Sequence, residues 1–408
     1  MKQGQLTVAG YVAERLGVQV GYLLLLLVAM LVSLGLIMVG SASMEVAADI
    51  YGNPFYFLKR HATYIGLGLV VSTVVYQIPL RYWQRYSGLL LLLGFILLTV
   101  AFIPGVGRSV NGSARWIGIG PLTLQASEIA KLFVIVYMAG YLVRRQEEVR
   151  EKWSGFLKPM AVLSVMVVLL LLEPDFGAVV VMVSAAMGMI FMSGARIQHF
   201  LIITVGCVVA GGMAIALAPY RVARTLSFLN PWADQFGSGY QLTQSLIAFG
   251  RGELFGVGLG QSIQKLFYLP EAHTDFVFAV MAEELGLVGD VFVILAFVAV
   301  VLCAFSIAVQ AKKAGQDYNC FLAYGIGLLI GIQAMINIGV NIGVLPTKGL
   351  TLPLVSYGGS SLMVSFVMVA LLLRIDRDCD EVVSTKVKTK KTDAKKVGRS
   401  NREVLANG

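Results

Sequence analysis

Residues 20–40 read VGYLLLLLVAMLVSLGLIMVG, an apolar run of 21 residues without a charged side chain. About 20 apolar residues in an α-helix cross the hydrocarbon core of a bilayer. Lys2 and Arg15 precede the run and small residues follow it, as in a signal peptide. A cleaved signal peptide, however, has a shorter apolar core of about 7–15 residues. The run therefore predicts an uncleaved first transmembrane helix.

The rest of the chain has the same apolar character. Of its 408 residues, 57% are hydrophobic and only 13% are charged, with a mean hydropathy of +0.79, whereas a soluble domain carries about 25% charged residues. We therefore predict an all-α polytopic membrane protein with about ten transmembrane helices. The segments expected to span the membrane are residues 20–41, 61–79, 86–103, 126–143, 157–173, 176–194, 197–219, 285–311, 319–344 and 352–374.

The distribution of lysine and arginine predicts the orientation in the membrane. With the N-terminus in the cytoplasm, the inner tails and connections hold 22 of the 32 lysines and arginines, and the outer connections hold nine. Because these residues concentrate on the cytoplasmic side, we expect both termini to be cytoplasmic. The net charge of +9 follows from this bias, so we do not expect nucleic acid as a partner. The outer connection 220–274, between the seventh and eighth spans, is long for a compact fold, which favours a functional role.

The chain divides into three predicted parts. Residues 1–19 form a cytoplasmic N-terminal tail, residues 20–376 the transmembrane domain, and residues 377–408 a basic cytoplasmic tail that we expect to be disordered. The lysines of the C-terminal tail either touch anionic membrane lipid or only enforce the topology. Three histidines and four cysteines without a CxxC motif argue against a zinc site.

The stretch LPEAHTDFVFAVMAEELG, residues 269–286, gathers ionisable side chains where the long outer loop meets an apolar run. Such groups are costly near a bilayer and usually line a cavity. Asp275, with His273 beside it, is therefore a candidate general base. The alternative is a helix N-cap formed by Thr274 or Asp275. Helical spacing predicts that Glu283 and Glu284 have partners other than those of Asp275.

The stretch NGSARWIGIGPLTLQASEIAKL, residues 111–132, holds a second set of candidates. Arg115 beside Trp116 suits a membrane interface and also suits phosphate binding. Glu128 and Lys131 are three residues apart, so they share one face of the fourth predicted helix. They form either a self-neutralising ion pair or a cation, oriented by Glu128, that faces an anionic substrate.

The stretch PTKGLTLPLVSYGGSS, residues 346–361, combines helix-breaking proline and glycine with several hydroxyl groups. Broken backbone within a membrane is tolerated where protein or water satisfies it, so this stretch predicts a cavity wall. Tight packing of small residues is the alternative. Lys348 and Ser356 are the candidate substrate contacts on this wall.

Three further charged residues lie outside these stretches. Asp290 interrupts the eighth span and has no obvious partner in the sequence. Glu173 and Asp175 flank Pro174 in a short outer turn, where exposure to solvent alone would explain them.

The three stretches, in this order and spacing, resemble the SEDS family of shape, elongation, division and sporulation proteins over roughly residues 15–376. The PTKGLTLP form with Lys348 is more similar to the cell-division branch, of FtsW type, than to the rod-elongation branch. The resemblance implies ten transmembrane helices with a large extracytoplasmic loop between helices 7 and 8, and a peptidoglycan glycosyltransferase activity. Ala126, where the family often has proline, and the charged Asp290 depart from the family pattern.

The resemblance also implies a substrate and partners. The enzyme would join units of lipid II, a disaccharide–pentapeptide carried on undecaprenyl pyrophosphate, at the outer face of the cytoplasmic membrane and at the division septum. It would work with a cognate class B penicillin-binding protein, a transpeptidase, and with other division proteins. A divalent cation, Mg²⁺ or Mn²⁺, is favoured and no organic cofactor is expected, although the sequence shows no set of metal ligands.

The resemblance assigns roles to individual residues. Asp275 matches the family's proposed catalytic aspartate, and Glu128 and Lys131 match functionally important positions of the fourth helix. Asp275 would take the proton of an attacking sugar hydroxyl, with inversion at the anomeric carbon, and Lys131, Arg115 or a metal would neutralise the leaving pyrophosphate. Two rival functions remain: a transporter that flips lipid II, which the absence of an evident inverted repeat disfavours, and a non-catalytic division scaffold.

Overall fold

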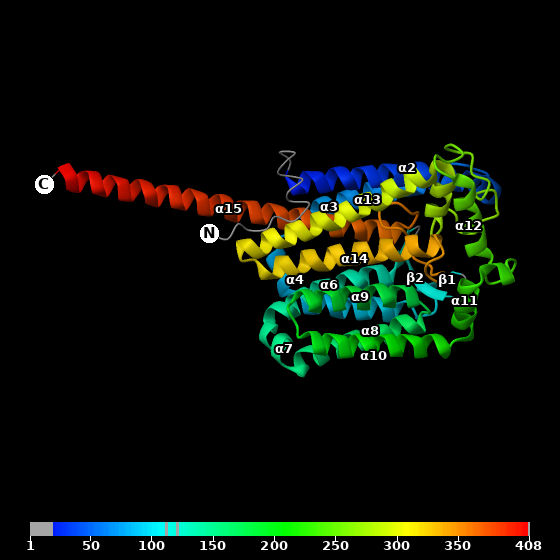
Figure 1. Ribbon diagram of the computed structural model, residues 1–408, viewed down its shortest axis with the longest axis horizontal. Helices are drawn as coiled ribbons and strands as arrows, with labels where there is room; N and C mark the ends of the chain where they lie inside the picture. Colours follow the sequence, from blue (N-terminus) through cyan, green and yellow to red (C-terminus); the bar gives the residue numbers. More distant parts are fainter. Residues whose placement is uncertain (1–18, 111–112, 120–121, 407–408) are drawn as a thin grey trace.

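The structure, a computed structural model, describes residues 19–110, 113–119 and 122–406 as an elongated bundle of helices (Figure 1). Each predicted span overlaps a helix. These helices are α2 (Val20–Tyr51), α3 (Tyr56–Gln77), α5 (Ser87–Val100), α6 (Ala126–Arg144), α8 (Trp153–Leu172), α9 (Phe176–Met192), α10 (Ile197–Ala216), α13 (Val277–Ala314), α14 (Asp317–Asn341) and α15 (Gly359–Ala406).

Seven of these helices are long and apolar enough to cross a membrane: α2, α6, α8, α10, α13, α14 and the first part of α15. Helices α5 and α9 are shorter apolar helices, and α3 carries Lys59 and Arg60 in its first turn. The polytopic all-α membrane architecture is thus confirmed, while the number of ten crossings stays a prediction.

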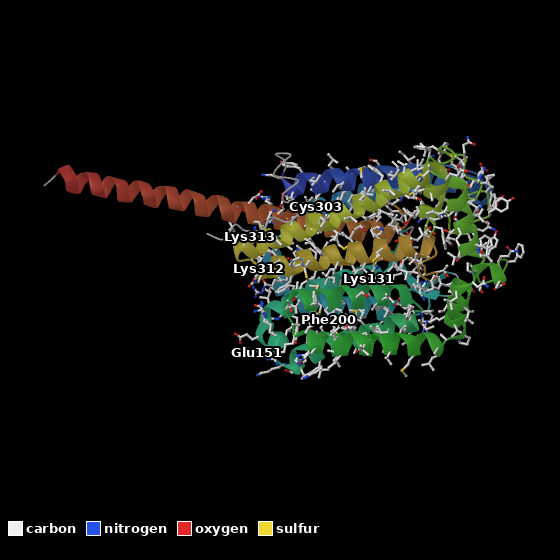
Figure 2. The ribbon with its side chains drawn as sticks, viewed as in Figure 1. Lys131, Glu151, Phe200, Cys303, Lys312 and Lys313 are labelled. Carbon is white, nitrogen blue, oxygen red and sulfur yellow. The ribbon has the colours of Figure 1, made fainter. Side chains whose placement is uncertain are left out.

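The two ends of the bundle differ (Figure 1). The short helices α11 (Pro219–Leu229) and α12 (Tyr240–Gly252), the 3₁₀ turn Pro231–Asp234 and the strands gather at one end. Helix α2 begins and α15 leaves the bundle at the other end, where α4 (Leu80–Arg85) and α7 (Gln146–Glu151) also lie. Lys312, Lys313 and Glu151 mark this second end in Figure 2. The two connections predicted to be outer, 104–125 and 220–274, therefore share one end of the molecule.

A small antiparallel sheet, which the sequence analysis did not predict, occupies the connection before α6. Its strands are β1 (Gly107–Val110), β2 (Ser113–Ile119) and β3 (Leu122–Gln125), in the order β1-β2-β3. Trp116 pairs with Gln125 and Ile117 with Leu124. Because β3 runs directly into α6, the sheet positions Arg115 and Gln125 over the end of the bundle.

Helix α13 begins earlier than the span predicted at 285–311. It starts at Val277 and contains a break at Gly286, whose φ of 69° lies in the left-handed region. A Cβ at this position would collide with the backbone nitrogen of Gly256, so only glycine fits here. The break separates a buried segment, residues 277–285, from the longer apolar part of the helix.

The C-terminal tail follows the last predicted span without a break in the helix. Helix α15 continues through residues 377–406 and projects from the bundle (Figure 1). This segment contains no proline and is rich in lysine, a good helix former, which accounts for the continuation. The boundary and the disorder of the tail stay predictions. The predicted N-terminal tail, apart from Gln19, and residues 407–408 lie outside the described residues.

Candidate active site

A cavity of about 320 Å³ lies at the end of the bundle where the sheet and the long loop gather. Its walls come from β2, from the turn between α8 and α9, from α11, from the loop before α13 and from the loop between α14 and α15. The lining therefore joins all three stretches singled out in the sequence. Its charged side chains are Arg115, Asp175, Arg221, Arg224, Glu271, Asp275 and Lys348.

Asp275 lies in the loop just before α13 and faces the cavity. Phe276 occupies the N-cap position of α13, and neither Asp275 nor Thr274 caps this helix end, so the N-cap interpretation of these two residues is wrong. Thr274 instead donates to Glu271, at 2.7 Å. Among the described residues, none makes a hydrogen bond or ion pair with the Asp275 carboxylate. This carboxylate is available to a ligand.

The surroundings of Asp275 favour its protonated form. Burial, and then the negative charge of Glu271, raise the pKa of Asp275 to about 7, against the opposing effect of Arg115 and Arg224. A carboxyl group with a pKa near neutrality is matched to general base catalysis. Gly349 lies close by, since a Cβ there would be 3.3 Å from Oδ2 of Asp275. Glycine at this position leaves the carboxylate room.

Three cations besides Arg115 line the same cavity. Arg221 and Arg224 are three residues apart on the amphipathic helix α11, and Lys348 comes from the loop between α14 and α15. The ammonium group of Lys348 lies 4.4 Å from the ring centroid of Phe176, and the guanidinium of Arg221 lies 5.5 Å from it. Burial and the charges of Arg224 and Arg221 lower the pKa of Lys348 to about 8. An anion bound here would relieve this repulsion.

Arg115 lines the cavity and also fastens its wall. Its Nε donates to the carbonyl oxygen of Glu173 at 2.9 Å, and its Nη2 donates to that of Pro174 at 2.7 Å. Pro174 has a φ of 30°, outside the usual range for proline, so this turn requires such support. Arg115 was predicted as a substrate contact, and the structure places it where it can also hold the turn.

Glu173 and Asp175 are buried, so their predicted explanation by solvent exposure is wrong. The sheet and the loops cover this turn. Asp175 caps α9 by accepting from the backbone of Ala178 at 3.1 Å, and it accepts from Ser127 at 2.9 Å. The Glu173 carboxylate has no hydrogen-bond partner among the described residues, and burial raises its pKa to about 8.

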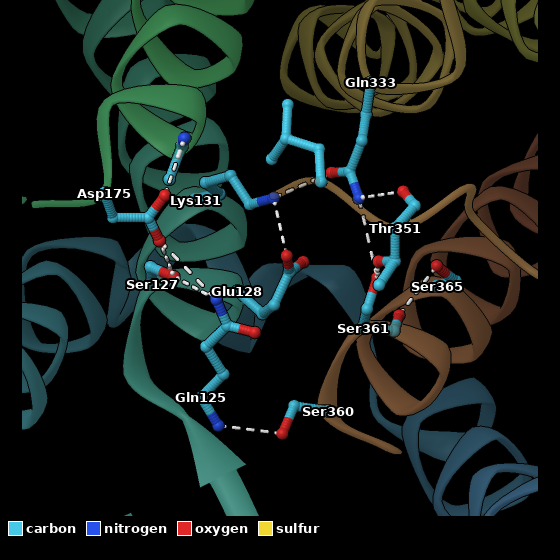
Figure 3. Close-up of polar contacts among 12 residues, drawn as sticks. Gln125, Ser127, Glu128, Lys131, Asp175, Gln333, Thr351, Ser360, Ser361 and Ser365 are labelled. Atoms are coloured by element: carbon cyan, nitrogen blue, oxygen red, sulfur yellow. Dashed lines mark hydrogen bonds and ion pairs between the residues drawn. The ribbon is translucent and has the colours of Figure 1, made fainter. Parts of the chain in front are cut away.

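Lys131 and Glu128 form the self-neutralising pair that was one of the two predicted alternatives (Figure 3). Lys131 is 1% exposed, and its ammonium group lies 2.9 Å from Glu128 and 2.7 Å from Oε1 of Gln333. Gln333 in turn donates to the carbonyl oxygen of Thr351 at 3.2 Å. Neither Lys131 nor Glu128 lines the cavity. The structure thus places them beneath the wall that carries Lys348.

His273 and Ser356, both predicted as substrate contacts, belong to the wall and do not line the cavity. The His273 ring lies 4.5 Å from that of Phe57 and 5.5 Å from that of Tyr357, measured between centroids, and burial lowers its pKa. The Ser356 hydroxyl accepts from the backbone of Leu352 at 2.8 Å and closes a turn.

Sequence reasoning missed Arg221, Arg224 and Gln125 as cavity residues. The signal for the arginines was their i, i+3 spacing in residues 219–229, which places both on one face of a short helix. Gln125 donates its backbone N–H to Ser360 at 2.8 Å, across 235 residues of sequence (Figure 3). No local sequence pattern predicts such a contact.

Glu283 and Glu284 have partners other than those of Asp275, as predicted. Arg251 lies 2.8 Å from Glu283, and Lys265 lies 3.1 Å from Glu284. These two ion pairs fasten the long loop to the start of α13. Asp290 is buried in α13 with one carboxylate oxygen unpartnered among the described residues, and nothing in the structure explains it.

A divalent cation would not find a complete set of protein ligands. In the part of the chain that the structure describes, no three His, Cys, Asp or Glu side chains converge to hold a metal. Mg²⁺ is often held by one or two carboxylates together with substrate phosphates. A divalent cation at this cavity would therefore take most of its ligands from the substrate phosphates and from water.

Comparison with known proteins identifies similar sequences over most of the chain. Residues 22–381 match the model of a family described as cell cycle proteins, FTSW_RODA_SPOVE. The probable peptidoglycan glycosyltransferase FtsW of Halomonas elongata is 56% identical over 349 residues, which cover 85% of this chain and 87% of that protein. The protein of the same name from Pseudomonas fluorescens is 55% identical over 346 residues, with 85% of each chain covered.

Solved structures show the same fold. A chain of a peptidoglycan synthase complex that coordinates polymerization and crosslinking superposes with a TM-score of 0.72 and 30% identity, covering 88% of this chain and 98% of that one. The rod shape determining protein RodA of Thermus thermophilus superposes with a TM-score of 0.65 and 28% identity, covering 87% and 96%.

Proposed function

The chain belongs to the FTSW_RODA_SPOVE family of cell cycle proteins, and we infer that it is a peptidoglycan glycosyltransferase of the FtsW type, active in cell division. The resemblance to the SEDS family drawn from the three sequence stretches is confirmed. The relatives named FtsW are more than 50% identical to it, and the RodA chain is 28% identical. This difference supports the division branch over the elongation branch.

The observation that carries the assignment is one cavity that is lined both by a carboxylate without a partner among the described residues and by several cations. Transfer of a sugar from a lipid pyrophosphate requires a base for the incoming hydroxyl and positive charge for the leaving group. Asp275 supplies the first, since its carboxylate faces the cavity without a partner among the described residues. Arg221, Arg224 and Lys348 supply the second.

The proposed substrate is lipid II, as donor and as the end of the growing strand. The donor pyrophosphate would bind against α11 and Lys348, with its sugar between these cations and Asp275. The acceptor hydroxyl would then approach from the Asp275 side, opposite the leaving pyrophosphate, and the anomeric centre would invert. Asp275 takes the hydroxyl proton as the new bond forms, a contribution of roughly 10²–10⁴-fold to the rate.

The cation assignment departs from the sequence expectation. Lys131 is committed to Glu128 and Gln333 and does not line the cavity, so it would support the wall rather than bind pyrophosphate. Arg115 lines the cavity and has two of its five N–H donors on backbone carbonyls. Its remaining donors leave it a candidate for a substrate contact. A divalent cation shared with the substrate phosphates stays a proposal, which polymerisation assays with and without a chelator would test.

The chain is a multi-pass membrane protein, and the proposed location is the cytoplasmic membrane at the division septum. A chain of similar fold belongs to a complex that couples polymerization to crosslinking. This supports a class B penicillin-binding protein as the partner that crosslinks the strands made here.

An assay of the purified protein with lipid II tests the function. Glycan strands as the product would support polymerisation. Movement of lipid II between the leaflets without polymer would indicate a transporter, and neither activity, even with the transpeptidase added, would indicate a scaffold. The buried Glu128–Lys131 pair is self-neutralising, so it does not favour the transporter.

A further inference from the structure

Helix α14 presents a row of three buried amide side chains to the loops of the cavity. Gln333, Asn337 and Asn341 are spaced by four residues, so they lie on one face of the helix. They are 3%, 2% and 0% exposed. Amides in a membrane-spanning helix are costly unless their hydrogen bonds are made, which makes their partners informative.

Asn341 connects α14 to the backbone around Asp275. Its Nδ2 donates to the carbonyl oxygen of Asp275 at 3.0 Å, while its Oδ1 accepts from the backbone N–H of Ala279 at 3.1 Å. The second bond gives the Ala279 N–H, in the first turn of α13, a side-chain acceptor in addition to the carbonyl oxygen of Phe276. One amide therefore holds both the residue before α13 and the first turn of that helix.

Asn337 connects two loops of the cavity to each other. Its Nδ2 donates to the carbonyl oxygen of Asp275 at 2.8 Å and to that of Leu350 at 2.5 Å. The Asp275 carbonyl thus receives two donors, the number that a carbonyl oxygen's two lone pairs can accept. Leu350 lies two residues beyond Lys348 in the chain. Asn337 is therefore a bridge between the loop of the carboxylate and the loop of the cation.

The bridge acts on the geometry that the reaction depends on. The carboxylate that takes the proton and the cation that faces the leaving group belong to separate loops, and neither side chain is paired with the other. Misplacement of a reacting group by about 1 Å can cost roughly 10²-fold in rate. Contacts that fix the backbone of both loops would limit such displacement without touching the substrate.

We propose that Asn337 and Asn341 are positioning residues, which hold the Asp275 backbone and set its place relative to Lys348. The inference rests on the proposed glycosyltransferase function. Neither amide lines the cavity, so they act through Asp275 and not through substrate binding. The expected signature is a loss of kcat with an unchanged KM.

The test measures polymerisation of lipid II by purified full-length Asn337→Ala and Asn341→Ala. Each is expected to lower kcat by roughly 10- to 100-fold, with a KM for lipid II within about twofold of that of the parent protein. The matched control is Asn319→Ala, because Asn319 is a buried asparagine at the far end of the same helix, and its side chain bonds to Gln316 and to no cavity loop among the described residues. The control is expected to keep the parent kcat.

Asn341→Ser is a second variant, which keeps the test valid if Asn341→Ala does not fold. A serine in a helix can satisfy its hydroxyl on the carbonyl four residues earlier, and it is too short to replace the Asn341 amide. It is expected to unfold near the parent temperature and to lose kcat like Asn341→Ala. An unchanged kcat in the folded asparagine variants, or a rise in KM that accounts for the whole loss, would overturn the inference. If the parent protein makes no polymer from lipid II, that result contradicts the proposed glycosyltransferase function itself.

Discussion

Two groups of charged side chains in this protein are arranged in opposite ways. Inside the bundle, Lys131 has Glu128 at 2.9 Å and Gln333 at 2.7 Å, and all three are buried (Figure 3). At the cavity, Asp275 has no hydrogen-bond partner for its carboxylate among the described residues, and Lys348 lies beside two further cations. The first group is internally complete, whereas in the second the Asp275 carboxylate makes no such bond and the charges that act on Lys348 are those of two cations.

The difference separates charges that support the fold from charges that serve a reaction. Removing a charge from water is costly, and a partner of opposite charge offsets that cost. Where a partner is built in, its removal should mainly destabilise the protein. Where the charge faces a cavity, its removal should mainly affect catalysis. Four predictions follow from this distinction, from the largest expected effect to the smallest.

Asp275→Asn is expected to lower kcat by roughly 10²–10⁴-fold, because the amide cannot accept the hydroxyl proton. Since the carboxylate supports no other contact in the described structure, the thermal unfolding temperature should stay close to that of the parent. Polymerisation kinetics and thermal unfolding of the purified protein measure the two effects. Asp234→Asn, in the same long loop but outside the cavity lining, is the control. Full activity of Asp275→Asn would show that this carboxylate is not the base.

Lys131→Met is expected to destabilise the protein by about 3–5 kcal/mol, since it leaves Glu128 buried without its cation. The double variant Lys131→Met, Glu128→Gln should recover a large part of this loss because no unpaired charge remains. Unfolding in detergent by heat or denaturant measures both. If Lys131→Met unfolds like the parent protein yet no longer binds lipid II, then Lys131 belongs with the catalytic charges.

Lys348→Gln is expected to lower kcat/KM by roughly 10- to 100-fold, equivalent to the loss of one hydrogen bond to a charged group, about 1.5–3 kcal/mol. The stability should not fall, because removing one of three neighbouring cations relieves repulsion. Initial rates at several lipid II concentrations provide the measurement. A variant that is unfolded, or one with the parent kcat/KM, would place Lys348 with the structural charges instead.

The dependence of kcat/KM on pH is expected to be bell-shaped, with its maximum between about 7 and 8. Burial raises the pKa of Asp275 to about 7 and lowers that of Lys348 to about 8. Below pH 7 the base becomes protonated, and above pH 8 the cation is lost, so the rate should fall about tenfold per unit on either side. Lys348→Arg should remove only the alkaline decline, since arginine stays charged. An alkaline decline that persists in Lys348→Arg would assign it to another group.

The sequence allowed the spans to be predicted because their signal is local. About twenty apolar residues in a row indicate a transmembrane helix wherever they occur in the chain. Each predicted range overlaps a helix of the structure. The aspartate before α13 was also identified from its neighbours in the chain. The sheet at residues 107–125 was missed, because its strands are only four, seven and four residues long and give too short a pattern to identify.

What the sequence by itself determined was the class of fold, the cluster around residue 275 and the family. Only the tertiary structure decided which charges are paired. Spacing allowed Lys131 to be either part of an ion pair or a substrate contact. In the structure it forms the ion pair, and Gln333, 202 residues away in the chain, is its second partner. Spacing likewise did not reveal that Asn337 bonds to Asp275 across 62 residues. The physical reason is that the energy of a buried charge or amide depends on partners brought close by folding, which no local pattern encodes.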